Sequence, residues 1–182
     1  MTILDVMSDP ELFGHWFQGP SWDAWRLFLS ALFALPISGA DAALFTKHTG
    51  RTTLPTKPAR EAWCIAGRRS GKSRIAAAIT IYVACFVARD AYLAPGEWAT
   101  VAIVAADRRQ ARTVLRYVEA LFEVPLLQSL VTGRTKESIE LGSLRTVIEI
   151  HTANFRKVQR ATGGLARPTR PTPSVPGATN AG

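Results

Sequence analysis

Cysteine and histidine are scarce in this chain, and their positions exclude the common metal sites. Among 182 residues there are two cysteines and three histidines. Cys64 and Cys85 form no C-x-x-C pair, and the histidines are scattered singly, so we do not expect a zinc site. Each cysteine falls in a segment that we predict to be buried, one in a strand and one in a helix. We therefore expect two core thiols in a reducing compartment.

Long apolar runs and an early positive charge are also missing. The longest apolar run, residues 75–88, lies between Arg74 and Arg89 and is too short to cross a bilayer. The N-terminus lacks the basic start of a signal peptide. These absences predict a cytoplasmic protein without a membrane partner.

Acidic residues are fewer than basic residues, and none follows Glu149 in the sequence. The 22 Lys and Arg residues against 14 Asp and Glu give a formal charge of +8, which favours a polyanionic partner such as nucleic acid. Basic surfaces are equally common as plain solvated faces, so charge leaves both interpretations open. Residues 156–182 contain no acid and no aromatic side chain and are rich in Pro, Thr and Arg. We predict that this tail is disordered.

The apolar fraction of 47% is nevertheless sufficient for a core, and one stretch organises the chain. Residues 63–73 read as a short buried strand, a tight loop ending in Gly-Lys-Ser and the start of a helix, which is the context of a phosphate-binding P-loop. Backbone N–H groups and the helix dipole would hold the phosphates of ATP, and the serine would bind Mg²⁺. The predicted nucleotide-binding residues are Gly67, Arg68, Arg69, Ser70, Gly71, Lys72 and Ser73, with Ser73 as the Mg²⁺ ligand.

This motif departs from the strict pattern at one position. Ala66 stands where the first glycine of G-x-x-x-x-G-K-[ST] is expected, and alanine does not adopt a positive φ cheaply. The alternative is an ordinary glycine-containing turn before a helix with exposed basic side chains. The order of strand, loop and helix favours phosphate binding.

The remaining pattern predicts an α/β fold. Helix signals start at Ser8 and cover residues 21–35, 72–89 and from Asp107 onward, whereas residues 46–60 read as a connector without regular structure. A buried strand of the parallel-sheet type is expected at 98–105. Two further strands, at 138–141 and 146–151, are expected to pair with each other through residues 142–145. We predict a P-loop NTPase-type parallel sheet flanked by helices, incomplete, in residues 46–155. A small helical segment, 1–45, precedes it, and the tail, 156–182, follows.

Hydrolysis requires acids that this sequence does not place well. A strand that ends in Asp-Glu usually holds the metal and activates water, and none is present. Asp107, at the end of the strand 98–105, is the nearest substitute, but Arg108 follows it. Asp107 reads as a metal ligand or, more naturally, as a helix cap with Gln110 as its capping-box partner. The chain is therefore expected to bind a nucleotide and to hydrolyse it poorly.

Three segments resemble one known family. Residues 60–77, 105–112 and 135–141 are similar to the ATPase start of the large terminase subunit of tailed bacteriophages. The resemblance implies an ATP-driven motor that moves double-stranded DNA into a capsid in a bacterial host. It also implies Arg68 acting on the phosphates during hydrolysis, and the small terminase subunit, the portal and further copies of the chain as partners.

The sequence also departs from that family. The Asp-Glu strand and the nuclease acids do not follow residue 155, and the abrupt change of composition predicts a truncated or frame-shifted gene. Two other classes stay open. One is another P-loop protein, such as a helicase-like ATPase or a small-molecule kinase, and the other is a non-catalytic remnant that binds DNA.

Overall fold

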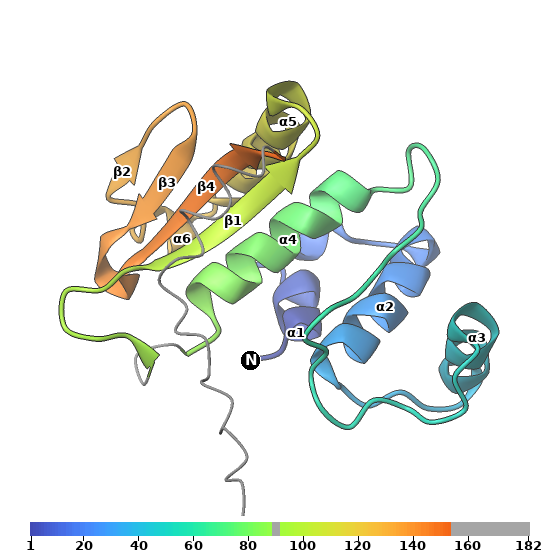
Figure 1. The fold of residues 1–182 in the computed structure, drawn as a ribbon. Coiled ribbons are helices and arrows are strands. Elements are labelled where there is room, and N and C mark those ends of the chain that lie inside the picture. Colours follow the sequence, from blue (N-terminus) through green and yellow to red (C-terminus); the bar gives the residue numbers. More distant parts are fainter. Residues whose placement is uncertain (89–91, 154–182) are drawn as a thin grey trace, which may run out of the picture.

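The computed structural model describes residues 1–88 and 92–153, so the predicted tail lies outside it (Figure 1). An N-terminal group of helices is followed by a sheet with helices packed on it. The helices are α1 (Ile3–Ser8), η1 (Gly14–Trp16), η2 (Pro20–Trp22), α2 (Asp23–Phe33), α3 (Ala40–Thr49), α4 (Lys72–Cys85), α5 (Arg108–Leu121), α6 (Pro125–Gln128) and η4 (Gly142–Leu144). The strands are β1 (Ala99–Ala105), β2 (Gly133–Arg134), β3 (Ser138–Leu141) and β4 (Thr146–Thr152).

The four strands form one mixed sheet in the order β1-β4-β3-β2. β1 pairs with β4 in parallel over their whole length, from Ala99 opposite Thr146 to Ala105 opposite Thr152. β3 pairs antiparallel with both β4 and β2. The expected α/β class and the three expected strands are confirmed. The hairpin expected from the last two strands is confirmed, with η4 between β3 and β4. The sheet as a whole is mixed rather than the parallel sheet that we predicted, because only β1 and β4 run parallel.

One face of the sheet is covered by helices. Alternate side chains of β4, namely Thr146, Ile148 and Ile150, are buried on the side where α4 and α5 pack. β1 alternates in the same way between half-buried and exposed residues, and Val104 on its open face is 48% exposed. The sequence predicts a buried strand of the parallel-sheet type here, with both faces covered. Within the described residues no second helical layer covers the open face, so that expectation is wrong.

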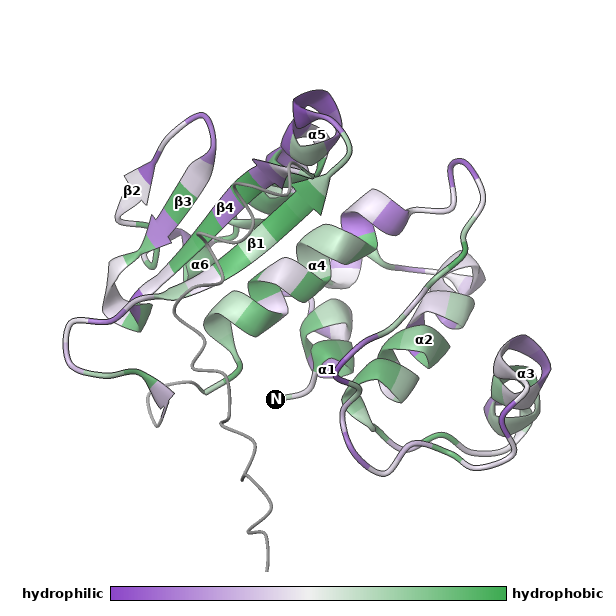
Figure 2. Ribbon diagram, viewed as in Figure 1, coloured by the Kyte–Doolittle hydropathy of each residue, from purple (hydrophilic) through white to green (hydrophobic). Residues whose placement is uncertain are grey.

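α4 lies in the middle of the molecule, between the sheet and the N-terminal helices (Figure 2). Ile75, Ala78 and Ile81 are almost fully buried, as expected for a helix that is apolar nearly all round. α5 buries a single stripe, which includes Leu115 and Val118, and exposes its arginines, as its sequence predicts. In the part of the chain that is described, no helix has the length and apolarity needed to span a membrane.

The N-terminal region differs from the prediction in two places. α1 ends at Ser8 instead of starting there, because Thr2 and Asp5 form a capping box at its beginning. Asp9 accepts a hydrogen bond from the N–H of Glu11 at 2.8 Å, which makes a turn from the residues that we interpreted as a helix start. α3 extends to Thr49 and so runs into the predicted irregular connector.

The largest difference concerns the strand predicted before the loop. Residues 61–66 are neither strand nor helix, Trp63 is 93% exposed, and Cys64 is exposed rather than a core thiol. A strand forms only where another strand can accept its backbone hydrogen bonds, and no described strand lies beside this segment. Cys85, by contrast, is half-buried in α4 against the core.

Candidate phosphate-binding site

The loop before α4 leaves the start of that helix open. Gly71 is the N-cap residue, with φ 83° and ψ 4°, and no side chain caps the first turn. Arg69 also has a positive φ, 59°, which is uncommon for a residue with a side chain. A left-handed residue followed by a helical one turns successive N–H groups toward one point, and this arrangement binds anions. Ala66 does not have a positive φ, as expected because its Cβ makes that conformation unfavourable.

Lys72 folds back over the loop. Its Nζ donates a hydrogen bond to the carbonyl oxygen of Gly67 at 3.0 Å, although the residue is exposed. The ammonium group is thus held near the loop backbone by one neutral acceptor. A phosphate would be a stronger acceptor for this ammonium than the carbonyl, because both partners would be charged.

Two tryptophans support the loop from the N-terminal helices. The indole N–H of Trp25 donates to the carbonyl oxygen of Ser70 at 2.6 Å. A Cβ placed on Gly71 would lie 2.7 Å from the ring of Trp22, so only glycine fits against this ring. The aromatic spacing of α2 by itself predicts core packing, and Trp25 and Leu29 are indeed buried. The contacts of Trp22 and Trp25 with the loop were not predicted, because the spacing of residues along one helix does not reveal which other segments the helix contacts.

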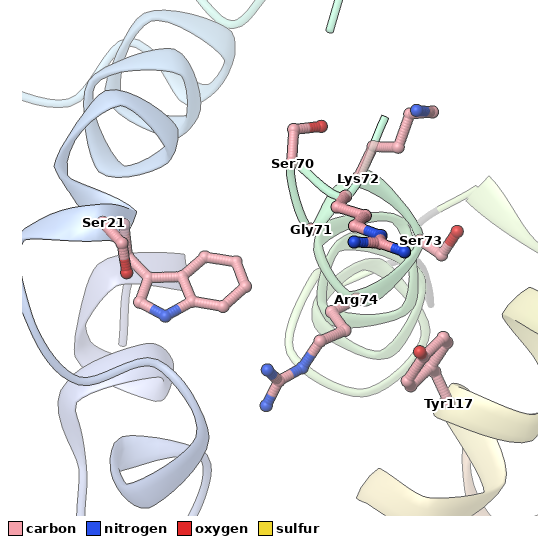
Figure 3. A pocket seen from close by; sticks show the side chains of 9 residues that line it. Ser21, Ser70, Gly71, Lys72, Ser73, Arg74 and Tyr117 are labelled. Atoms are coloured by element: carbon pink, nitrogen blue, oxygen red, sulfur yellow. The ribbon is translucent and has the colours of Figure 1, made fainter. Parts of the chain in front are cut away.

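The loop opens into a cavity of about 560 Å³. It is lined by residues 69–74 together with Ser21, Trp22 and Tyr117, the last from α5 (Figure 3). Arg69, Lys72 and Arg74 contribute three cations, and none of the described residues that line the cavity is acidic. Five of the seven predicted nucleotide-binding residues, Arg69 to Ser73, are therefore brought together here, whereas Gly67 and Arg68 are exposed outside the lining.

Arg74 is held in place beside the cavity. Its guanidinium donates to the carbonyl oxygen of Trp16 at 3.0 Å and lies over the ring of Trp22, 5.2 Å from the centroid. It also approaches the ring of Phe17 at 5.7 Å. This side chain has its own partners and therefore acts mainly as a fixed positive wall of the cavity.

The hydroxyl of Ser70 is buried and has no hydrogen-bond partner among residues 1–88 and 92–153. An unsatisfied buried hydroxyl costs about 1–3 kcal/mol. The loop is thus incomplete in this conformation, because one polar atom lacks the acceptor or donor that it requires.

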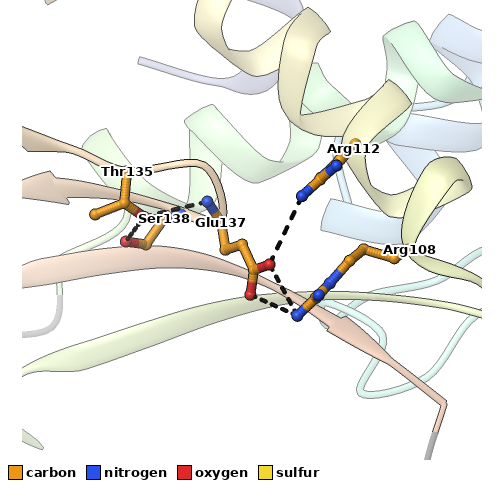
Figure 4. Close-up of polar contacts among 5 residues, drawn as sticks. All are labelled: Arg108, Arg112, Thr135, Glu137 and Ser138. Atoms are coloured by element: carbon orange, nitrogen blue, oxygen red, sulfur yellow. Dashed lines mark hydrogen bonds and ion pairs between the residues drawn. The ribbon is translucent and has the colours of Figure 1, made fainter.

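Asp107 acts as a helix cap in this structure. Its Oδ1 accepts a hydrogen bond from the N–H of Gln110 at 2.9 Å, which satisfies the first turn of α5. Beside it, Arg108 contacts Glu137 at 2.8 Å and Arg112 approaches the same carboxylate at 3.9 Å (Figure 4). The predicted cap is confirmed. Among residues 1–88 and 92–153 no three His, Cys, Asp or Glu side chains come together in a way that could hold a metal ion.

Comparison with known proteins adds no relative. No family model matches the chain, and no curated protein and no solved structure matches it either.

Proposed function

We propose that this chain binds the phosphates of ATP at the loop before α4, as the nucleotide-binding part of a DNA-packaging motor of the terminase type. The observation that carries the proposal is the uncapped start of α4, where the left-handed Gly71 and the cation Lys72 face a cavity without acids. The loop sequence and the resemblance of its flanking segments supply the motor class. The setting would be the cytoplasm of a bacterial host.

The residues present fit the phosphates better than they fit the metal. N–H groups, three cations and an unsatisfied buried hydroxyl provide the donors that phosphate oxygens require. For Mg²⁺ the chain offers the hydroxyl of Ser73, and the other ligands would be phosphate oxygens and water. Mg²⁺ would supply neutralisation of the phosphate charge. Lys72 would exchange its bond to Gly67 for one to a phosphate oxygen.

Turnover is not part of the proposal. Asp107 is engaged by α5, and no described acid lines the cavity to orient water. Arg68 is exposed and is not among the described residues that line the cavity. We therefore propose binding without efficient hydrolysis.

DNA is the proposed macromolecular partner. The formal charge of +8 and the exposed arginines of α5 would supply cations for phosphodiester groups. The same proposal includes three further partners: a small terminase subunit, a portal and other copies of this chain. These partners rest on the family resemblance alone. DNA binding with steep salt dependence but without any influence of ATP would instead favour a non-catalytic DNA-binding remnant.

The test is equilibrium binding of Mg-ATP to the full chain, with phosphate release followed in the same samples. We expect Lys72→Ala to weaken binding by about 10- to 100-fold, the value of a hydrogen bond to a charged group. Lys57→Ala removes an exposed lysine outside the cavity and serves as the matched control. Equal affinities of the two variants would contradict the proposal. Phosphate release that depends on Lys72 would contradict only the absence of turnover.

A further inference from the structure

The two edges of the sheet are built differently. β2, at one edge, has only two residues, and the exposed Arg134 and Lys136 lie at its end. Short length and charge are devices that prevent a sheet edge from pairing with another chain. β1, at the other edge, has seven residues without a charge or a proline, and its register with β4 is continuous. The edge of β1 therefore lacks the usual protection and is a template for a further strand.

One segment of the same chain has the properties of the missing strand. In residues 61–66, Trp63 is 93% exposed and Ile65 is fully exposed, although both residue types favour strands. No backbone group of this segment bonds to the backbone of another described residue. Its six residues are comparable in length with the seven of β1.

The segment is held away from β1 of its own chain. Just before it, the N–H of Ala59 donates to the carbonyl oxygen of Leu32 in α2 at 2.8 Å. Just after it, the carbonyl oxygen of Ser70 accepts from Trp25, also in α2, at 2.6 Å. In Figure 1 the segment runs on the α2 side of α4, and β1 lies on the other side. These two hydrogen bonds attach both flanks of the segment to α2 of its own chain.

We propose that residues 61–66 of one copy pair as an added strand with β1 of a second copy, at the edge where no described strand pairs with β1. Each copy carries both a donor segment and an acceptor edge, so two copies can exchange them reciprocally. The pairing would satisfy backbone groups on both sides and remove Trp63 and Ile65 from water. This interface does not depend on nucleotide binding.

Cys64 provides a direct test, because it is exposed in the middle of the donor segment. A cysteine on a neighbouring strand comes within disulfide distance when it lies opposite. The full chain with Cys85→Ala would carry Thr100→Cys, Ala102→Cys or Val104→Cys, which sample three registers along β1. Lys136→Cys places the thiol at the other edge as a control. The chains are oxidised, and the linked peptides are identified by mass spectrometry.

We expect a disulfide-linked dimer joining Cys64 to at least one of the β1 cysteines, with much less product for Lys136→Cys. Equal yields at the two edges, or no dimer, would overturn the proposal. A disulfide between Cys64 and β1 within a single chain would also overturn it, since pairing would then be intramolecular.

Molar mass measured by light scattering gives a second test that needs no new cysteine. The wild-type chain should dimerise as its concentration rises. Ile65→Lys should raise the chain concentration at which half of the protein is dimeric by at least tenfold. Leu126→Lys alters another exposed apolar residue, 57% exposed and away from both surfaces, and should leave dimerisation unchanged. A wild-type chain that stays monomeric, or equal effects of the two lysines, would contradict the pairing. Lys72→Ala should still dimerise, so failure of nucleotide binding and failure of this interface are distinguishable.

Discussion

The helices α4 and α5 begin in opposite ways. α5 starts with Asp107, whose carboxylate accepts the N–H of Gln110, and Arg108 beside it is paired with Glu137. α4 starts with Gly71, which offers no side chain, and with Lys72, which donates a hydrogen bond to the carbonyl oxygen of Gly67. A helix start that is satisfied by its own carboxylate has little to offer an anion. The difference teaches that the open start, rather than the number of cations nearby, marks the candidate site.

Gly71→Ala should have the largest effect on stability. The new Cβ would lie 2.7 Å from the ring of Trp22 and would force a left-handed alanine. We expect a loss of about 2 kcal/mol in the free energy of unfolding, measured with urea. Gly50→Ala is the matched control, because Gly50 has a φ of 69° with no atom near its Cβ. Equal losses in both variants would show that Trp22 does not constrain the loop.

Asp107→Ala should affect stability but not nucleotide binding. Loss of the cap should lower the free energy of unfolding by about 1 kcal/mol in urea denaturation. Asp107→Asn should keep most of this stability, because asparagine also caps helices. Mg-ATP affinity, measured in the same samples, should stay within twofold of wild type. Asp107 caps α5 and does not line the cavity, so its loss should leave nucleotide binding nearly unchanged. A Mg²⁺-dependent loss of affinity would assign Asp107 to the metal.

Glu137→Gln should have a smaller effect at the same helix start. The carboxylate contacts Arg108 and Arg112, and all three side chains are substantially exposed. Exposed pairs contribute about 0.5 kcal/mol, and salt screens them. The difference in unfolding free energy from wild type should therefore disappear at high salt. A difference that persists there would indicate a packing role for Glu137 instead.

The smallest expected effect concerns the start of α1. There the side chains of Thr2 and Asp5 each accept a hydrogen bond from the other residue's backbone N–H. The backbone hydrogen bond from Thr2, followed by that from its side chain, lowers the pKa of Asp5 below its ordinary value of 3.8. Because the folded-state pKa is the lower one, this contribution is present above pH 3.8 and is lost as pH falls through the folded-state value. Thermal melts at acidic pH should show less pH dependence for Asp5→Asn than for wild type. An identical dependence would mean that Asp5 does not couple to folding.

Several elements could be predicted because their signals are local. The stripe of Ala111, Leu115 and Val118 repeats at helical spacing, and α5 buries that stripe. Asp107 precedes the stripe and caps the helix as expected. The hairpin of β3 and β4 follows from two apolar segments around a glycine. Each pattern lies within one element and needs no distant partner to be recognised.

Other elements could not be predicted in this way. α3 buries one residue, Phe45, and its last turn contains Lys47 and His48. The end of this helix therefore reads as part of the polar connector predicted at 46–60. The contact between Trp25 and the loop joins residues 45 positions apart. No spacing rule connects them, although this contact decides where the candidate site lies.

The sequence by itself determined the helices with a strong stripe, the cap at Asp107 and the loop residues that could face an anion. Tertiary structure alone decided that residues 61–66 form no strand and that β1 is an edge strand of the described sheet, with no described helix on one face of that sheet. The physical reason is the range of the hydrogen bonds. A helix satisfies its backbone within four residues, whereas a strand depends on a partner that only the complete fold places beside it.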